Sequence, residues 1–141
     1  MLALITLPTW PAAARPLQAA VAPDQRRDID PGETIARVQK AISDGDVQML
    51  SKYTSAYTEV SILGATTMYS RAQTAYILKA FFRDHPPARF TFDHRLHMGE
   101  DWFVRGRYFD RGRQTPYRLE MTMRWNGRQL EIKSIRISRL R

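Results

Sequence analysis

The chain has 141 residues, a length that favours a single domain. Hydrophobic residues make up 43% and charged residues 26%, an ordinary globular composition that suffices for one hydrophobic core. The sequence has no cysteine, which excludes disulfides, thiolate nucleophiles and cysteine-ligated metals. The formal net charge of +8 indicates an anionic partner such as nucleic acid, lipid head groups or an acidic glycan.

The chain begins with an export-signal-like segment. Residues 1 to 14, MLALITLPTWPAAA, are mostly apolar and uncharged, too short to span a bilayer, and end in small residues that suit processing. We therefore expect export to the periplasm or cell envelope. The alternative is a disordered tail, rich in proline and alanine, on a cytoplasmic protein. Residues 15 to 29 lack periodicity and are interpreted as a linker, so that residues 1–29 precede a folded domain at 30–141.

Two helices are predicted at the start of that domain. Asp30 can accept a hydrogen bond from the first free amides, Pro31 fits the first helical position, and Glu33 completes a capping pattern. Gly45 is a natural left-handed stop, and Asp46 can cap a second, shorter helix. The helical spacing of the first helix is carried by Ile35, Val38 and Ile42.

A short strand and a long helix come next. Residues 57 to 64, YTEVSILG, predict a strand that ends in a turn. Ser70 and Gln73 form a capping box, and the Pro86-Pro87 pair prevents the helix from continuing beyond about residue 84. The helix has an apolar face that needs a large apolar surface to pack against; it consists of Ile77, Leu78, Phe81 and Phe82.

The remaining chain alternates with the period of strands. Strands are predicted from residue 90 to 98, from 102 to 109 and from 117 to 125. Asn126-Gly127 is a strong hairpin signal, and the apolar parity changes after it, which predicts a bulge near Lys133 or Ser134. We therefore expect an α+β, cone-like fold in which the N-terminal helices pack on the concave face of a strongly bent antiparallel sheet.

Strand parity suggests a pocket inside this cone. His94 is the only imidazole on the predicted inward side, with Tyr108 and Tyr117 as partners, so His94 is the candidate base. The alternative is a core histidine with a satisfied hydrogen bond. Outward positions for Asp93 and Glu120 argue against a carboxylate-based isomerase. The predicted pocket consists of Phe81, Phe92, His94, Tyr108, Tyr117, Met121 and Trp125.

The opposite parity carries arginines. They form a predicted basic face that suits a lipid head group or glycan, and the alternative is a solvated surface; its members are Arg95, Arg105, Arg107, Arg118 and Arg124. Only Phe103 and Phe109 offer rings for stacking, so nucleic acid is a less favoured partner. The three histidines lack metal-site spacing and no phosphate-binding loop occurs, so we predict neither a metal site nor a cofactor.

These motifs together resemble a known family. YSRAQTAYILKAFFRDHPP, FVRGRY, YRLEM and LEIKSIRIS, over about residues 33 to 139, look like the small bacterial family catalogued as domain of unknown function 4783. The resemblance implies a nuclear transport factor 2-like fold and an export signal, but no activity. Some branches of that superfamily use an apolar pocket for isomerase or dehydratase chemistry. The chain departs from the family pattern in its arginine density and its longer connection over residues 110–116.

Two functional hypotheses follow. The first is an exported, non-catalytic domain that binds an envelope component or a small apolar ligand through its cone or its basic face. The second is a small pocket enzyme of isomerase or dehydratase type that uses His94. A homodimer is compatible with both hypotheses.

Overall fold

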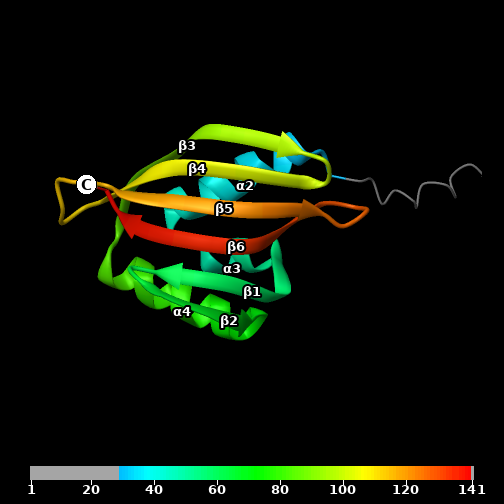
Figure 1. The fold of residues 1–141 in the computed structure, drawn as a ribbon. Coiled ribbons are helices and arrows are strands. Elements are labelled where there is room, and N and C mark those ends of the chain that lie inside the picture. Colours follow the sequence, from blue (N-terminus) through cyan, green and yellow to red (C-terminus); the bar gives the residue numbers. More distant parts are fainter. Residues whose placement is uncertain (1–28, 141) are drawn as a thin grey trace, which may run out of the picture.

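The domain has its helices in the first part of the chain and most of its strands in the second. The computed structural model describes residues 29–140, so the predicted export signal and the linker up to residue 28 lie outside the described residues. The chain order is α2 (Pro31–Asp44), α3 (Val47–Ser51), β1 (Thr54–Ile62), β2 (Ala65–Ser70), α4 (Arg71–Asp84), β3 (Pro87–Met98), β4 (Asp101–Asp110), β5 (Tyr117–Trp125) and β6 (Leu130–Arg139). Figure 1 shows one curved sheet with the helices behind it.

The first two helices begin and end where their capping residues predict. The Asp30 carboxylate accepts a hydrogen bond from the Glu33 amide, and Pro31 occupies the first turn. Gly45 ends α2 with a φ of 67°, a left-handed conformation that favours glycine. Asp46 caps α3 by accepting a hydrogen bond from the Met49 amide.

The β1–β2 hairpin contains a strand that the sequence did not predict. Ile62 pairs with Ala65, so only Leu63 and Gly64 form the turn, both with positive φ. The prediction ended with the turn at Gly64, whereas β2 follows it and runs directly into α4. Alternation failed as a signal because the first four residues of β2 are exposed on both faces.

Helix α4 confirms the capping box. The Ser70 hydroxyl accepts a hydrogen bond from the Gln73 amide, and the Gln73 side chain accepts one from the Ser70 amide. The helix ends before the Pro86-Pro87 pair, and the His85 amide donates to the Phe81 carbonyl. Leu78, Phe81 and Phe82 are buried as predicted, and Ile77 is half-buried.

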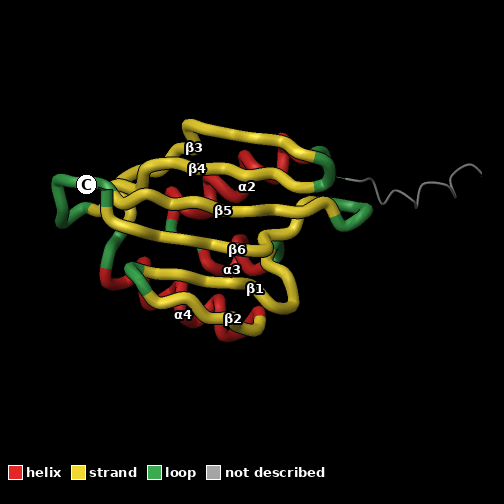
Figure 2. The backbone as a smooth tube through the Cα atoms, in the orientation of Figure 1, coloured by secondary structure: helices red, strands yellow, loops and turns green. Residues whose placement is uncertain are grey.

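The six strands form one sheet in the order β2-β1-β6-β5-β4-β3. Figure 2 shows them as a single layer with the helices on one side. The covered side is called the inner face below, and the other side the outer face. The α+β fold is confirmed, with one feature that sequence signals did not specify: β1 and β6 pair in parallel, while the other neighbours are antiparallel.

Two bulges decide which face several side chains occupy. Ser134 pairs with Thr122 and Ile132 with Met123, so Lys133 is the extra residue and the predicted bulge is confirmed. A second bulge was not predicted: Phe92 pairs with Gly106 and His94 with Arg105, leaving Asp93 as the extra residue. Since one extra residue inverts the alternation, the parity predicted for β3 fails beyond Phe92.

Helix α2 lies against the β3 and β4 half of the inner face. The Ser43 hydroxyl donates to the Phe90 carbonyl at 2.8 Å, and the Phe92 amide donates to the Gln39 side chain at 2.9 Å. A Cβ atom at Gly106 would lie 2.2 Å from the Thr91 carbonyl oxygen and 2.9 Å from the Phe90 ring. Glycine at this position therefore lets β3 and the Phe90 ring approach β4 closely.

Candidate functional site

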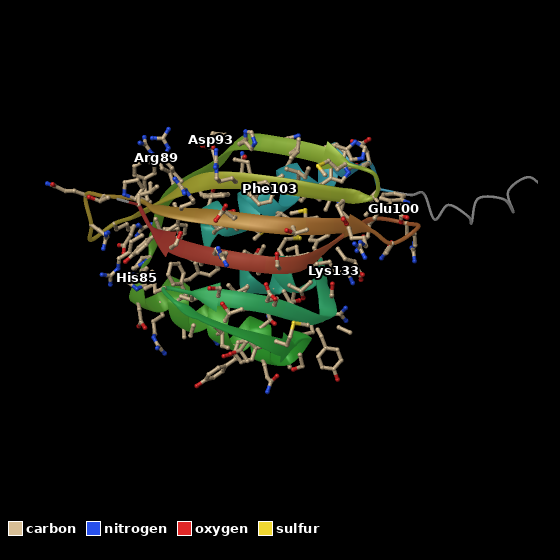
Figure 3. The ribbon with its side chains drawn as sticks, viewed as in Figure 1. His85, Arg89, Asp93, Glu100, Phe103 and Lys133 are labelled. Atoms are coloured by element: carbon tan, nitrogen blue, oxygen red, sulfur yellow. The ribbon has the colours of Figure 1, made fainter. Side chains whose placement is uncertain are left out.

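The outer face carries an arginine groove. We define it by Arg105 and Arg107 on β4 and Arg118 on β5. Arg107 and Arg118 pair directly across the two strands, and Arg105 lies two residues along β4, on the same face. A shallow hollow of about 300 Å³ opens here, also lined by Asp93, Gly106 and Leu140. In Figure 3, which has the outer face toward the viewer, Asp93 lies above the sheet at the β3 end of this region.

The charges of the groove are only partly neutralised. The Arg107 Nε atom lies 3.4 Å from an Asp93 carboxylate oxygen, and both side chains are exposed, so the pair contributes little to stability. Among the described residues, neither Arg105 nor Arg118 forms an ion pair. Glu120 pairs with Arg105 across the strands without reaching ion-pair distance. The groove therefore presents two free guanidinium groups beside a weakly engaged third.

Two members of the predicted basic face lie outside this groove. Arg95 was predicted to point outward, but it pairs with the buried Val104 and so belongs to the inner-face side, at an exposed end of β3. Arg124 is on the outer face, where its guanidinium holds Asp101 with contacts of 2.8 and 3.2 Å. This hydrogen bond lowers the pKa of Asp101 and raises that of Arg124.

His94 is also misplaced by the prediction. The bulge at Asp93 puts His94 opposite Arg105 on the outer face, and its side chain is exposed. The expectation of an inward imidazole beside Tyr108 and Tyr117 is therefore wrong. Its physical cause is the same one-residue insertion that displaces Arg95.

The other predicted pocket residues lie on the inner face. The Phe81 ring centroid is 5.3 Å from that of Tyr108 and 5.9 Å from that of Tyr117, and all three side chains are buried. Met121 is buried in the same core, and Phe92 and Trp125 pack against it half-buried. The space predicted as a pocket is thus filled by these side chains themselves.

A polar cluster that the sequence did not predict joins α4 to β4. The His85 Nδ1 atom lies 2.8 Å from an Asp110 carboxylate oxygen; the His85 side chain is 27% exposed and that of Asp110 only 7%. The Tyr108 hydroxyl donates to the His85 carbonyl, and the Tyr117 hydroxyl oxygen is 3.4 Å from Nδ1. Figure 3 shows His85 at the left end of the molecule.

Two members of this cluster, Asp110 and Tyr108, have shifted pKa values. Burial tends to raise the pKa of Asp110, but the Gly112 amide, the His85 ring and the Arg113 charge outweigh burial and hold that pKa below its usual value. Asp110 is therefore ionised at neutral pH, and because an ionised carboxylate can only accept hydrogen bonds, the His85 Nδ1 atom is the donor in their contact. Burial raises the pKa of Tyr108 well above its usual value, which keeps its hydroxyl protonated as a donor.

A histidine held by a carboxylate, as His85 is by Asp110, is also found where histidine acts as a general base. In this protein the same contacts have a structural role. They connect His85, which caps the C-terminal end of α4, to Asp110 at the end of β4. The Phe81 ring packs against the His85 ring, with ring centroids 4.8 Å apart. His85 and Asp110 are 25 residues apart, so no spacing pattern could have paired them. Among residues 29–140 no group of three or more His, Asp or Glu side chains could hold a metal ion.

No helix within residues 29–140 is long and apolar enough to cross a membrane.

The fold is shared with several solved structures. A DUF4783 family protein from Bacteroides ovatus is 23% identical, with a TM-score of 0.71 over 82% of this chain and 98% of that one. Another from Bacteroides uniformis is 24% identical, with a TM-score of 0.70 over 75% and 96%. A putative dehydratase of the NTF2-like family from Streptomyces avermitilis is 14% identical, with a TM-score of 0.58 over 78% and 93%. These similarities establish a nuclear transport factor 2-like fold.

Sequence comparison gives the family. No curated protein matches the chain. Residues 35–138 match the family model described as Domain of unknown function (DUF4783), a region that covers most of the described domain and agrees with the motifs noted in the sequence. The chain therefore belongs to the DUF4783 family, whose function is unknown.

Proposed function

We propose that this protein is a non-catalytic binding domain whose arginine groove holds the phosphate or sulfate groups of an anionic envelope component. The observation that carries the proposal is the hollow of about 300 Å³ lined by Arg105, Arg107 and Arg118, two of which have no carboxylate partner among the described residues. An isolated cluster of like charges on a sheet is unfavourable, since like charges opposite one another repel. An anion in the groove would relieve that repulsion.

The chemistry of the three side chains supports an oxyanion ligand. Guanidinium groups bind phosphate, sulfate or carboxylate oxygens through two parallel hydrogen bonds, which lysine cannot do. Arg107 and Arg118 sit on neighbouring strands, which lie about 5 Å apart, so both can reach one phosphate-sized group. The exposed Asp93 carboxylate can be displaced from Arg107, because the two side chains meet at 3.4 Å in solvent.

The source of the anion is proposed from the start of the sequence. The apolar, uncharged residues 1 to 14 support export, and the envelope contains lipid head groups and acidic glycans, which share this oxyanion chemistry. The inner-face packing supports neither an apolar ligand inside the cone nor a pocket enzyme built on His94, since Phe81, Tyr108 and Tyr117 fill that space and His94 is on the outer face.

The test compares a groove variant with a charge-matched control. The groove variant carries Arg105→Glu with Arg118→Glu, and the control carries Arg83→Glu with Arg128→Glu, two exposed arginines away from the outer face. Elution from heparin and co-sedimentation with vesicles of anionic or neutral lipid are measured over a range of salt. We expect wild type and control to need similar salt for release, while the groove variant is released earlier and its logarithmic salt dependence is shallower by roughly 1 to 2 units.

The two supports, heparin and lipid vesicles, also distinguish a glycan from a lipid head group as the source of the anion. Groove-dependent binding to anionic vesicles and not to heparin identifies a lipid head group, and the reverse identifies a glycan. Competition by inorganic phosphate or sulfate reports the shared oxyanion site. If the groove variant behaves like the charge-matched control on both supports, the protein's affinity is only a consequence of its net charge and the proposal fails.

A further inference from the structure

A second hollow adjoins the arginine groove on the outer face, and we call it the polar pocket. It has a volume of about 180 Å³ and spans four neighbouring strands. Figure 3 shows one member, Phe103 on β4, on the face turned toward the viewer. The polar side chains that line it are Glu120 and Thr122 on β5, Ser134 and Arg136 on β6, and Glu59 and Ser61 on β1.

The polar pocket and the arginine groove are continuous along β4 and β5. Phe103 of the pocket and Arg105 of the groove are two residues apart on β4, so their Cα atoms are about 7 Å apart and their side chains share one face. Glu120, which lines the pocket, pairs with Arg105 across the two strands. One small ligand can therefore occupy both sites at once.

The charges of the two sites are opposite. The groove has three guanidinium groups against one carboxylate, whereas the polar pocket has two carboxylates, Glu59 and Glu120, against the guanidinium of Arg136. Within the described part of the chain, neither of these two carboxylates forms an ion pair. Free carboxylates repel an anionic group but accept hydrogen bonds from hydroxyl groups. The part of a ligand that suits the polar pocket is therefore uncharged and carries hydroxyls.

A nearly buried hydroxyl in the pocket also favours a polar ligand. Ser61 is only 8% exposed, and its hydroxyl has no hydrogen-bond partner among the described residues. The fully enclosed unpaired hydroxyls are those of Thr34 and Thr74, so the Ser61 hydroxyl opens into the pocket that it lines. Such a group is costly to leave unpaired. Thr122 and Ser134 add two hydroxyls that face each other across β5 and β6.

The apolar part of the pocket suits a ring and not a hydrocarbon chain. Phe103 is half-buried, and an aromatic ring packs well against the C–H face of a sugar ring. The other apolar residues at the pocket, Met121 and Ile135, have their side chains buried in the core. An acyl chain would therefore lie against carboxylates and hydroxyls and deprive them of hydrogen bonds, which is unfavourable.

We propose that the polar pocket binds the ring of a saccharide whose phosphate or sulfate group lies in the arginine groove. The inference rests on the proposed function for the anionic group and adds the class of ligand. Glu59 and Glu120 come from strands on either side of β6, about 10 Å apart, so they can accept hydrogen bonds from hydroxyls on two sides of one ring. Phe103 contacts the ring itself.

Amide NMR spectra of the full chain give a separate readout for each site, because Gly106 lines the groove and Ser134 lines the polar pocket. The probes are inorganic phosphate and the 6-phosphates of glucose, mannose, galactose and N-acetylglucosamine. We expect phosphate to shift the Gly106 signal alone. At least one sugar phosphate should shift both signals, with a dissociation constant at least about tenfold below that of phosphate, because it adds hydrogen bonds in the pocket.

A pocket variant, Glu59→Gln with Phe103→Leu, separates the two sites. It removes a negative charge, so weaker binding of a sugar phosphate cannot result from the net charge. Phosphate should still bind within about twofold of wild type, which also shows that the variant is folded, while the advantage of the sugar phosphate is lost. The control, Glu100→Gln with Tyr76→Leu, removes one charge and one ring at exposed positions outside both sites and should keep the advantage.

The outcomes distinguish this inference from the proposed function. If phosphate shifts the Gly106 signal but none of the four sugar phosphates binds more tightly, or if the pocket variant keeps the advantage, the saccharide inference is wrong and the anion site remains. If no probe shifts Gly106, the proposed function fails and the inference fails with it. Dihexanoyl phosphatidic acid, kept below its micelle concentration, tests the competing lipid. Tighter binding than every sugar phosphate, with a shift at Ser134, would assign the pocket to lipid and overturn the inference.

Discussion

The inner and outer faces of the same strands have opposite characters. On β4, Val104 and Tyr108 are fully buried on the inner face, whereas Arg107, which lies between them in sequence, is exposed on the outer face. Apolar side chains from the helices and the strands fill the inner face, so the space predicted as a pocket is core in this protein. The outer face holds the open, charged groups. Comparing the two faces shows where ligand chemistry is available: on the side of the sheet that the helices leave uncovered.

The largest expected effect contrasts one phenylalanine from each side. Phe81→Ala removes a ring that contacts Tyr108 and Tyr117 in the core and should lower the free energy of unfolding by about 3 to 5 kcal/mol. Phe103→Ala removes the same atoms from the outer face, where the ring is only half-buried, and should cost clearly less, about 1.5 kcal/mol or below. Urea unfolding at one pH measures both.

This pair of variants tests the assignment of the two faces. Similar costs for both substitutions would mean that the outer face is as tightly packed as the inner one. The argument for the arginine groove, which requires an uncovered outer face, would then lose its basis.

Local signals predicted the elements that depend on neighbouring residues. Ser70 with Gln73 predicted the start of α4, and Asn126-Gly127 predicted the hairpin between β5 and β6. The shift from Ile132 to Ile135 revealed the bulge at Lys133, because apolar residues change parity there. The parallel pairing of β1 and β6 was not predicted, since strands far apart in sequence carry no local mark of their partner.

The site was harder to predict than the fold for related reasons. Phe90, Phe92, Leu96 and Met98 keep one apolar parity across the bulge at Asp93, although the residues of β3 beyond Phe92 are exposed on both faces. The sequence therefore gave no sign that His94 and Arg95 had exchanged faces. In contrast, Arg105, Arg107 and Arg118 lie on β4 and β5, which pair in an unbroken register, and their outward position was predicted correctly.

The next largest effect concerns the buried carboxylate of Asp110, which contacts His85 at the end of α4. Asp110→Asn keeps the size of the side chain and removes its charge, so the hydrogen bonds to His85 and Gly112 weaken and the free energy of unfolding should fall by about 1 to 3 kcal/mol at neutral pH. The pKa of Asp110 is lower in the folded protein than its ordinary value. The stabilisation by its charge is therefore fully present above about pH 4, the range of an unfolded aspartate, and is lost as pH falls through the folded pKa.

Denaturant unfolding from neutral to acidic pH measures this dependence. Wild type and Asp110→Asn should differ most at neutral pH and converge in acid. Asp84→Asn is the matched control: its exposed carboxylate pairs only with the exposed Arg83, so its pH profile should follow that of wild type. A constant gap between wild type and Asp110→Asn down to the lowest pH would show that the charge of Asp110 does not stabilise the fold.

The smallest expected effect tests the bulge at Asp93, which places Phe92 on the inner face and His94 on the outer face of β3. His94 lies opposite Arg105 on the outer face and is exposed, so His94→Ala should change the free energy of unfolding by less than about 0.5 kcal/mol. Phe92, two residues earlier, lies on the inner face against Phe90 at a ring distance of 4.8 Å, and Phe92→Ala should cost at least about 1 kcal/mol. Thermal and urea unfolding of both variants give the comparison. If His94→Ala costs as much as Phe92→Ala, then both side chains share the inner face, β3 has no extra residue at Asp93, and the basic face regains Arg95 at the expense of the groove geometry described above.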